Sequence, residues 1–163
     1  MGSRSPTNLI WLILGLAAFF LLHNRHIGGQ APDFALQGVY GGDDYHLDSF
    51  HGKSVLLVFW TTSCGICRHE LPILDRVYTA AARNNVEIAC VNIGDIDGAR
   101  EILRPLRFHL NLVDPDGSAA HSYGVSGVPE LVLVGADKKI KWSVSGLQSE
   151  ETLRAKLAPA TRD

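Results

Sequence analysis

The sequence contains very little cysteine: three residues in 163, at positions 64, 67 and 90. A zinc site usually has four ligands, so a lone C-x-x-C pair needs a second pair or two histidines to complete it. Outside the pair formed by Cys64 and Cys67 only Cys90 remains, and His69 would share a helical turn with Cys67. These counts argue against a zinc centre, and we predict no metal and no other cofactor.

An excess of basic residues is also absent. Lys and Arg number 15 against 17 Asp and Glu, which gives a formal net charge of -2 and an isoelectric point near 6.4. A nucleic-acid-binding surface needs a basic patch, so we predict no nucleic-acid partner. The sequence has no internal repeat and no low-complexity tract, and its length suits one compact domain with an appendage.

Only one apolar run is long enough to concern a membrane, at residues 9–22 (LIWLILGLAAFFLL). It is shorter than the roughly 20 residues of a full span, so it fits a secretory signal or an anchor completed by its flanks. Bulky residues at 19–22 replace the small ones that a cleavage site needs. We predict an uncleaved anchor, a removed signal being the alternative. A buried helix of a soluble domain fits less well, because such a helix is usually apolar on one face only.

The predicted organisation is therefore an anchor or signal segment over residues 1–27, a linker over 28–32 (GGQAP) and a folded domain over 33–163. A hydrophobic segment ahead of a globular domain usually exports that domain. Outside the cytoplasm disulfides form and persist. A dithiol in that location is useful as a catalyst that makes or breaks disulfides.

The C-x-x-C pair at residues 64–67 (CGIC) lies between an apolar, β-rich run at 55–60 and a helical stretch that follows. A helix N-terminus offers unpaired N–H groups and partial positive charge, which lower the pKa of a thiol placed there from about 8.5. A second thiol one turn away can displace a mixed disulfide. Covalent haem attachment needs His after the second cysteine, where Arg68 stands. A purely structural role is improbable, because so short a loop restrains the unfolded chain very little.

Hydrophobic periodicity and turn residues predict the secondary structure. In chain order the expected elements are an extended segment at 33–36 forming a hairpin with a short strand at 45–48, a strand at 53–60, a helix to 84–85, a strand at 86–93, a helix at 97–107, a short strand at 109–113, a short helix at 118–123, two strands at 131–134 and 139–144 joined by a hairpin turn, and a final helix capped by Ser149. This order predicts an α/β domain with a mixed central sheet and helices on both faces, plus the N-terminal hydrophobic helix. The pattern resembles the thioredoxin fold.

Four separated motifs agree with one family: residues 31–34 (APDF), 58–72 (VFWTTSCGICRHELP), 114–117 (DPDG) and 123–130 (YGVSGVPE). With them the chain resembles the membrane-tethered, thioredoxin-like thiol–disulfide oxidoreductases of the TlpA/ResA/CcmG (DsbE) group. The likeness covers nearly all of the predicted soluble part.

The resemblance implies roles for individual residues. Cys64 corresponds to the nucleophile and Cys67 to the resolving thiol, the two forming the redox-active disulfide. Pro129 matches the cis-proline that lies opposite the dithiol, and Val128 matches the residue that offers its backbone to a substrate chain. With Val128, Trp60 and Ile66 are the expected substrate-binding residues.

Glu70 stands where ResA-like proteins have a glutamate, three residues after the second cysteine. One helical turn from Cys67, its carboxylate could accept a proton from that thiol. The alternative is a solvent-facing glutamate in the first turn of a helix, where negative charge is favourable. The buried acid of thioredoxin itself has no counterpart, because Val58 occupies its position.

The chain also departs from the family pattern. Ser63 replaces the tryptophan that commonly precedes the first cysteine, which predicts a wider groove or a more exposed Cys64. Ile66 replaces a proline common in reductants of the group. Cys90 lies in a predicted buried strand and is expected to be an inert packing residue, with a regulatory thiol as the alternative.

The resemblance implies a reductase at the bacterial inner membrane, with its domain on the periplasmic or extracytoplasmic side. Its expected partners are protein thiols and disulfides, such as apocytochrome c, and a membrane electron donor of the DsbD/CcdA type. A peroxiredoxin-like peroxidase is an alternative, since Thr61 and Cys64 fit the spacing P-x-x-x-T-x-x-C, but Leu57 stands at the proline position. A further alternative is a disulfide-handling protein for copper or oxidative stress, because thiolates suit Cu(I).

Overall fold

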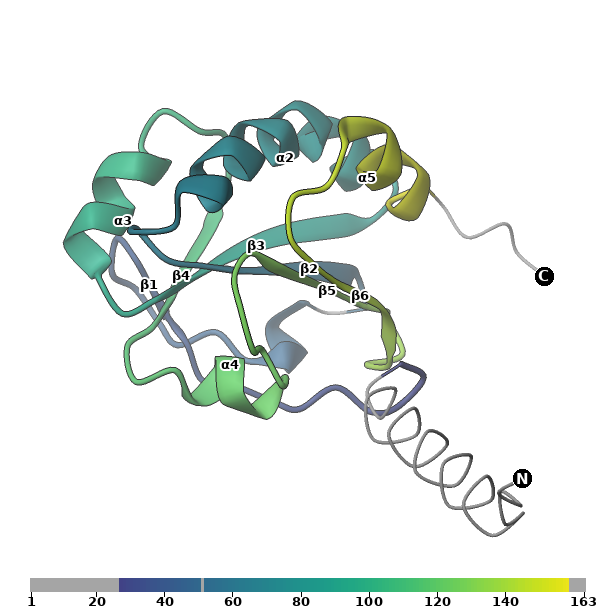
Figure 1. The fold of residues 1–163 in the computed structure, drawn as a ribbon. Helices are drawn as coiled ribbons and strands as arrows, with labels where there is room; N and C mark the ends of the chain where they lie inside the picture. The colour runs from purple at the N-terminus through teal and green to yellow at the C-terminus, as the bar shows by residue number, and fades with distance from the viewer. Residues whose placement is uncertain (1–26, 51, 159–163) are drawn as a thin grey trace, which may run out of the picture.

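The computed structural model describes residues 27–50 and 52–158. The chain forms one sheet whose strands run in the order β1-β4-β3-β2-β5-β6 (Figure 1). The elements are β1 (Gln37–Gly38), the 3-10 helix η1 (Leu47–Phe50), β2 (Ser54–Trp60), α2 (Gly65–Arg83), β3 (Val86–Ile93), α3 (Ile96–Leu103), β4 (Leu110–Asp114), α4 (Ser118–Ser122), β5 (Glu130–Val134), β6 (Ile140–Ser145) and α5 (Glu150–Lys156).

The sheet is mixed, as predicted. β2, β3 and β4 are parallel, whereas β5 is antiparallel to β2, β6 to β5, and β1 to β4. Central strand β2 is buried from Val55 to Trp60 because both of its faces are covered. The active-site motif starts directly after this strand.

Two apolar cores lie on the two faces of the sheet. Alternate residues of β2 from Leu56 to Trp60 join the core beneath α2, α3 and α5, and the intervening ones from Val55 to Phe59 join the core on the side of η1 and α4. Helices therefore cover both faces, as Figure 1 shows with α2 and α5 above the sheet and α4 below it. This arrangement confirms the predicted thioredoxin-like fold.

The predicted hairpin is only partly present. Residue 45 makes a single antiparallel bridge with Leu36, and the chain then turns into η1 instead of continuing as a strand to 48. The Leu47 N–H donates a hydrogen bond to the Asp33 carboxylate at 2.8 Å, and Phe50 is buried in the second core. These tertiary contacts favour the tight turn over a longer strand.

Helix α3 is shorter than predicted, ending at Leu103 rather than at 107. Arg104 still has helical backbone angles, but Pro105 has no N–H to continue the hydrogen-bond ladder, so the helix ends before it. At the other end the Asp95 carboxylate accepts a hydrogen bond from the Gly98 N–H at 3.1 Å and caps the helix.

The residues predicted as a linker lie along the start of β6. The Gly28 N–H donates to the Ile140 carbonyl at 2.7 Å, the Ile140 N–H donates to the Gly29 carbonyl at 3.0 Å, and the Ala31 N–H donates to the Lys138 carbonyl at 2.8 Å. In the sheet register Ile140 pairs with Val134, at the end of the sheet away from the dithiol.

The predicted hydrophobic helix over residues 9–22 lies outside the described residues. Within residues 27–50 and 52–158, no helix has both the length and the apolar character to cross a bilayer.

Candidate active site

The two cysteines of the motif form a disulfide at the N-terminus of α2. Strand β2 ends at Trp60, a turn closes with the Cys64 N–H donating to the Thr61 carbonyl at 3.2 Å, and Cys64 is the N-cap of the helix. The cysteine Cα atoms are 5.3 Å apart, and the Cys67 N–H donates to the Cys64 sulfur at 3.0 Å. The same N–H would stabilise a Cys64 thiolate after reduction.

The two sulfurs differ in access to solvent. Cys64 is partly exposed, whereas Cys67 is only 1% exposed and packs in the core beneath α2. Ile66 between them is 54% exposed. A partner's sulfur can therefore approach Cys64 from outside, while Cys67 is accessible only from within the molecule.

The Val128–Pro129 peptide bond is cis, as the resemblance implied. The Val128 carbonyl oxygen lies 3.7 Å from the Cys64 sulfur, although 64 residues separate the two in sequence. On the other side, the Pro129 carbonyl accepts a hydrogen bond from the Gly146 N–H at 2.8 Å. The loop before β5 thus lies directly against the Cys64 sulfur.

Glu70 is buried, with an exposed fraction of 1%. One carboxylate oxygen accepts a hydrogen bond from the Gln148 N–H at 2.9 Å, and the other has no hydrogen-bond partner among the described residues. Burial raises the pKa of Glu70 to about 7, and the Gln148 N–H opposes this shift. The alternative of a solvent-facing glutamate is wrong, and the carboxyl group can both take and give a proton near neutral pH.

Gln148 contributes to the site, although it was not predicted from the sequence. Residues 146–148 connect β6 to α5, and this connection touches both Pro129 and Glu70 through backbone N–H groups. The Gln148 amide side chain also donates to the Gly146 carbonyl at 2.9 Å, which braces the turn. Nearly every residue type has a backbone N–H, so the sequence carries no signal for this contact.

The comparisons with known proteins agree with this site. The sequence profile of the AhpC/TSA family matches residues 27–143, more than half of the chain. The chain belongs to the AhpC/TSA family. It is 31% identical over 134 residues to the thiol-disulfide oxidoreductase ResA of Geobacillus thermodenitrificans, covering 80% of this chain and 76% of that protein. It is 32% identical over 141 residues to the thiol:disulfide interchange protein DsbE of Pseudomonas fluorescens, covering 84% and 76%.

A solved structure shares the fold as well. The secreted disulfide oxidoreductase of Mycobacterium tuberculosis homologous to E. coli DsbE superposes with a TM-score of 0.66 at 26% identity, covering 76% of this chain and 93% of that one. Within the AhpC/TSA family this chain is therefore a thiol–disulfide oxidoreductase of the ResA/DsbE type, an enzyme.

Trp60 and Cys90 are both completely buried in the core. Trp60 is fully buried and packs in the core beneath α2. The prediction that its indole contacts the substrate directly is therefore wrong. Cys90 is a free thiol with no exposed surface, and burial raises its pKa above the ordinary value. Both observations leave Cys64 and Cys67 as the reactive pair.

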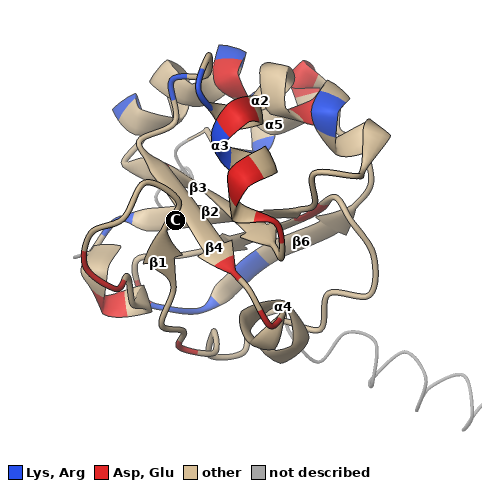
Figure 2. Ribbon diagram, turned by 90° about the vertical axis from the view of Figure 1, so that its left-hand side faces the viewer, with Lys and Arg blue, Asp and Glu red and all other residues tan. Residues whose placement is uncertain are grey.

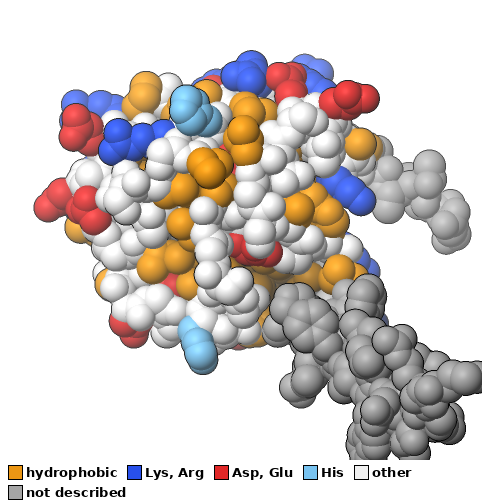
Figure 3. Space-filling view, viewed as in Figure 1, with side chains coloured by type: hydrophobic (Ala, Val, Ile, Leu, Met, Phe, Trp, Pro, Cys, Tyr) orange, Lys and Arg blue, Asp and Glu red, His pale blue; other side chains and the backbone are white. Residues whose placement is uncertain are grey.

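The exposed surface around the dithiol is partly apolar. Hydrophobic side chains gather over the start of α2 and the adjoining connection from β6 to α5 (Figure 3). Two large side chains of these segments, Ile66 and Leu147, are 54% and 50% exposed. Such a surface suits contact with another polypeptide.

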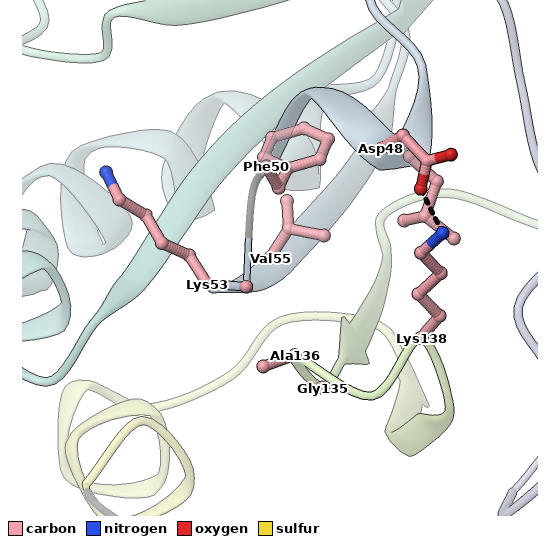
Figure 4. Close-up of a pocket in the computed structure, with 9 residues that line it drawn as sticks. Asp48, Phe50, Lys53, Val55, Gly135, Ala136 and Lys138 are labelled. Carbon is pink, nitrogen blue, oxygen red and sulfur yellow. Dashed lines mark ion pairs between the residues drawn. The ribbon is translucent and has the colours of Figure 1, made fainter.

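A separate hollow of about 320 Å³ lies at the opposite end of the sheet (Figure 4). Phe50 and Val55 line it, and Lys138 pairs with Asp48 at its edge. It is remote from the dithiol, so we assign it no part in the chemistry. Across the part of the chain that the structure describes, no three His, Cys, Asp or Glu side chains are grouped to hold a metal ion.

The difference in exposure predicts different alkylation rates for the two thiols of the family motif. In a Cys90→Ala background, the variant that keeps only Cys64 should react with iodoacetamide at neutral pH at least roughly tenfold faster than the variant that keeps only Cys67, because the thiolate fraction and access both favour it. Rates measured between pH 5 and 9 test this. Faster alkylation of Cys67 near pH 7 would reverse the assignment of nucleophile and resolving thiol.

Proposed function

We propose that this oxidoreductase is an extracytoplasmic reductase of protein disulfides, held at the bacterial inner membrane by residues 9–22 with its domain on the periplasmic or extracytoplasmic side. The observation that carries the proposal is Glu70, which is buried one helical turn after Cys67 in α2 and has one carboxylate oxygen without a hydrogen-bond partner among the described residues. A carboxyl group there disfavours a Cys67 thiolate, and Gly65-Ile66 between the cysteines carries no group that would stabilise one. A dithiol whose thiolates are destabilised gives up electrons more readily.

The proposed reaction is thiol–disulfide exchange in two steps. The Cys64 thiolate attacks one sulfur of the substrate disulfide; a Cys64–substrate disulfide forms, the substrate S–S bond breaks and one substrate thiolate leaves. Cys67 then gives its proton to the Glu70 carboxylate and attacks the Cys64 sulfur, which releases the second substrate thiolate. Two electrons have passed to the substrate, and the Cys64–Cys67 disulfide seen in the structure is the product state.

The cis-proline loop provides the place where a substrate chain lies. Val128 is partly buried, and its carbonyl oxygen faces the Cys64 sulfur at 3.7 Å. Its backbone is outside any strand, so an extended substrate segment can pair with it while a substrate sulfur reaches Cys64. Pro129 follows Val128 in this loop, and the exposed Ile66 side chain, two residues after Cys64, offers apolar surface to the substrate.

The proposed substrates are the oxidised cysteines of apocytochrome c or of other proteins, and the proposed donor is a membrane dithiol protein of the DsbD/CcdA type. Both come from the resemblance to the ResA/DsbE group. The donor restores the Cys64–Cys67 dithiol by the same exchange in the opposite direction. A relative described as secreted supports the extracytoplasmic location.

A peroxidase has less support. Leu57 stands where the peroxidase pattern has proline, and it is fully buried in the centre of β2. The disulfide also joins Cys64 to a partner within the same helical turn. Handling of disulfides under copper or oxidative stress remains compatible with the same dithiol chemistry.

The reduction potential of the dithiol and its redox state in cells test whether the protein is a reductase. Equilibration with glutathione buffers should give a reduction potential nearer the roughly −270 mV of thioredoxin than the roughly −120 mV of DsbA. In cells the protein should be mostly reduced, and should become oxidised when the membrane donor is deleted. A potential near that of DsbA, with mostly oxidised protein in cells, leaves an oxidase instead.

A further inference from the structure

A polar depression of about 510 Å³ lies next to the turn that precedes Cys64, on the side of α3. Thr62 and Ser63, the two residues before Cys64, form one wall, and Arg68 of α2 adjoins them. Asp95, which caps α3, and Glu101 within α3 also line it. The reductase mechanism uses none of these side chains.

The walls of the depression are held by hydrogen bonds. Two nitrogens of the Arg68 guanidinium donate to the Thr62 carbonyl at 3.1 and 3.0 Å. The Thr62 hydroxyl donates to the Asp95 carboxylate at 3.1 Å, and the other oxygen of that carboxylate caps α3 through the Gly98 N–H. These contacts tie the start of α2, the turn before the disulfide and the start of α3 into one unit, so the depression is preformed.

Negative charge prevails inside it. Hydrogen bonds from Gly98 and Thr62 hold the pKa of Asp95 below its ordinary value, so this carboxylate is ionised. The Glu101 side chain is exposed, and its carboxylate makes no ion pair or hydrogen bond with any residue in the described ranges. Against these two carboxylates stands one cation, Arg68, which is directed to the Thr62 carbonyl. Figure 2, which turns the α3 side to the viewer, shows charges of both signs along α3.

The same depression has an apolar part. Ile102 and Pro105 line it next to Glu101. Long basic side chains place their methylene stem on apolar surface and their charged end at an acceptor. The combination of an apolar strip, an unpaired carboxylate and an excess of negative charge therefore matches Lys or Arg better than any other side chain.

We propose that this depression is a substrate subsite that receives a Lys or Arg side chain from a residue within about three positions of the substrate's reactive cysteine, with Glu101 as its main ion-pair partner. Extended chain advances roughly 3.3–3.6 Å per residue, so such a side chain lies within reach when the substrate sulfur is at Cys64. The proposal rests on the proposed function in one respect: it takes the partner to be a polypeptide.

The test uses two synthetic peptides that share one disulfide and differ only in Lys or Glu two residues from a cysteine. Single-turnover exchange is measured with the full-length protein in both directions, reduced protein with disulfide peptide and oxidised protein with dithiol peptide. At low salt we expect the Lys peptide to react about three- to fivefold faster, the size of one exposed ion pair. The preference should fall towards one at 0.5 M salt, where the Debye length is only a few ångströms.

Glu101→Lys should abolish or reverse the preference, and Glu101→Gln should reduce it with no reversal. Glu151→Lys is the matched control: it makes the same charge change at an exposed position on α5, outside the lining residues, and should keep the parent's preference. Ser63→Trp should also lower the preference by narrowing the mouth of the depression.

Equal rates for the two peptides in both directions overturn the subsite. A faster Glu peptide also overturns it and makes Arg68 the deciding group. The direction in which exchange runs to completion reports separately on the reductase proposal, because the ratio between peptides does not depend on which partner starts reduced.

Discussion

Cys64→Ser is expected to abolish disulfide exchange, whereas Cys67→Ser is expected to leave the protein trapped as a mixed disulfide with its partner. The first substitution removes the exposed sulfur that a partner can reach, and the second removes the buried sulfur that releases the partner. Turnover should fall by at least about a thousandfold in both variants, since neither can complete the exchange cycle.

Trapped adducts distinguish the two variants. Non-reducing gels and mass spectrometry should detect a substrate adduct with Cys67→Ser and none with Cys64→Ser. Cys90→Ala is the control and should keep the parent's turnover, because this thiol is buried and its pKa is raised. Equal residual turnover in the two active-site variants would contradict a C-x-x-C mechanism.

Glu70→Gln is expected to slow turnover and to remove a pH dependence from both rate and stability. The amide keeps the shape of the side chain but can neither accept the Cys67 proton nor carry charge. Loss of one proton-transfer group predicts a rate about a hundredfold lower near pH 7. The pH–rate profile of the variant should lose the step near pH 7 that the parent shows.

The stability effect follows from the raised pKa of Glu70. Because the folded-state pKa, about 7, lies above the ordinary value of 4.5, the folded form binds the proton more tightly than the unfolded form. The stabilisation that the parent gains from the proton on Glu70 should therefore be fully present below about pH 4.5. It should be lost as pH rises through about 7. Glu70→Gln should be more stable than the parent by about 1–3 kcal/mol at pH 8 and similar to it near pH 5.

Urea denaturation of the oxidised protein at the two pH values measures this difference. Glu151→Gln makes the same chemical change at an exposed position of α5 and should show no such pH-dependent gain. If the pH profiles of stability and rate are the same for Glu70→Gln and the parent, Glu70 is only a packing residue at the start of the helix.

Much of the fold could be predicted because the central elements have simple patterns. β3 was predicted over residues 86–93, and its bounds in the structure are the same; β2 differs by one residue. Each is a nearly continuous apolar run of strand length, as expected for a strand covered on both faces. The edge of the sheet was predicted less well, because β1 has only two residues and is defined by its pairing with β4.

The site could be predicted in part for a similar reason. Cys64 and Cys67 stand at a strand–helix junction that the sequence displays directly. The cis bond before Pro129 and the placement of Glu70 depended on the resemblance to a family, since a lone proline or glutamate has no distinguishing pattern. Contacts made by backbone groups, such as that of Gln148, depend on how distant segments pack and were not predictable.

Together with the proposed anchor, the hydrogen bonds between residues 28–31 and the start of β6 would limit how far the dithiol can lie from the membrane. With the proposed anchor in a bilayer, residues 23–27 can span at most about 18 Å. The seven residues of β2 then separate the pinned end of the sheet from Cys64 by about 20 Å. If residues 9–22 anchor the chain as proposed, the Cys64 sulfur stays within roughly 40 Å of the lipid surface. A partner must present its cysteines within that distance, so lengthening residues 23–27 changes which partners the dithiol can meet without altering the dithiol itself.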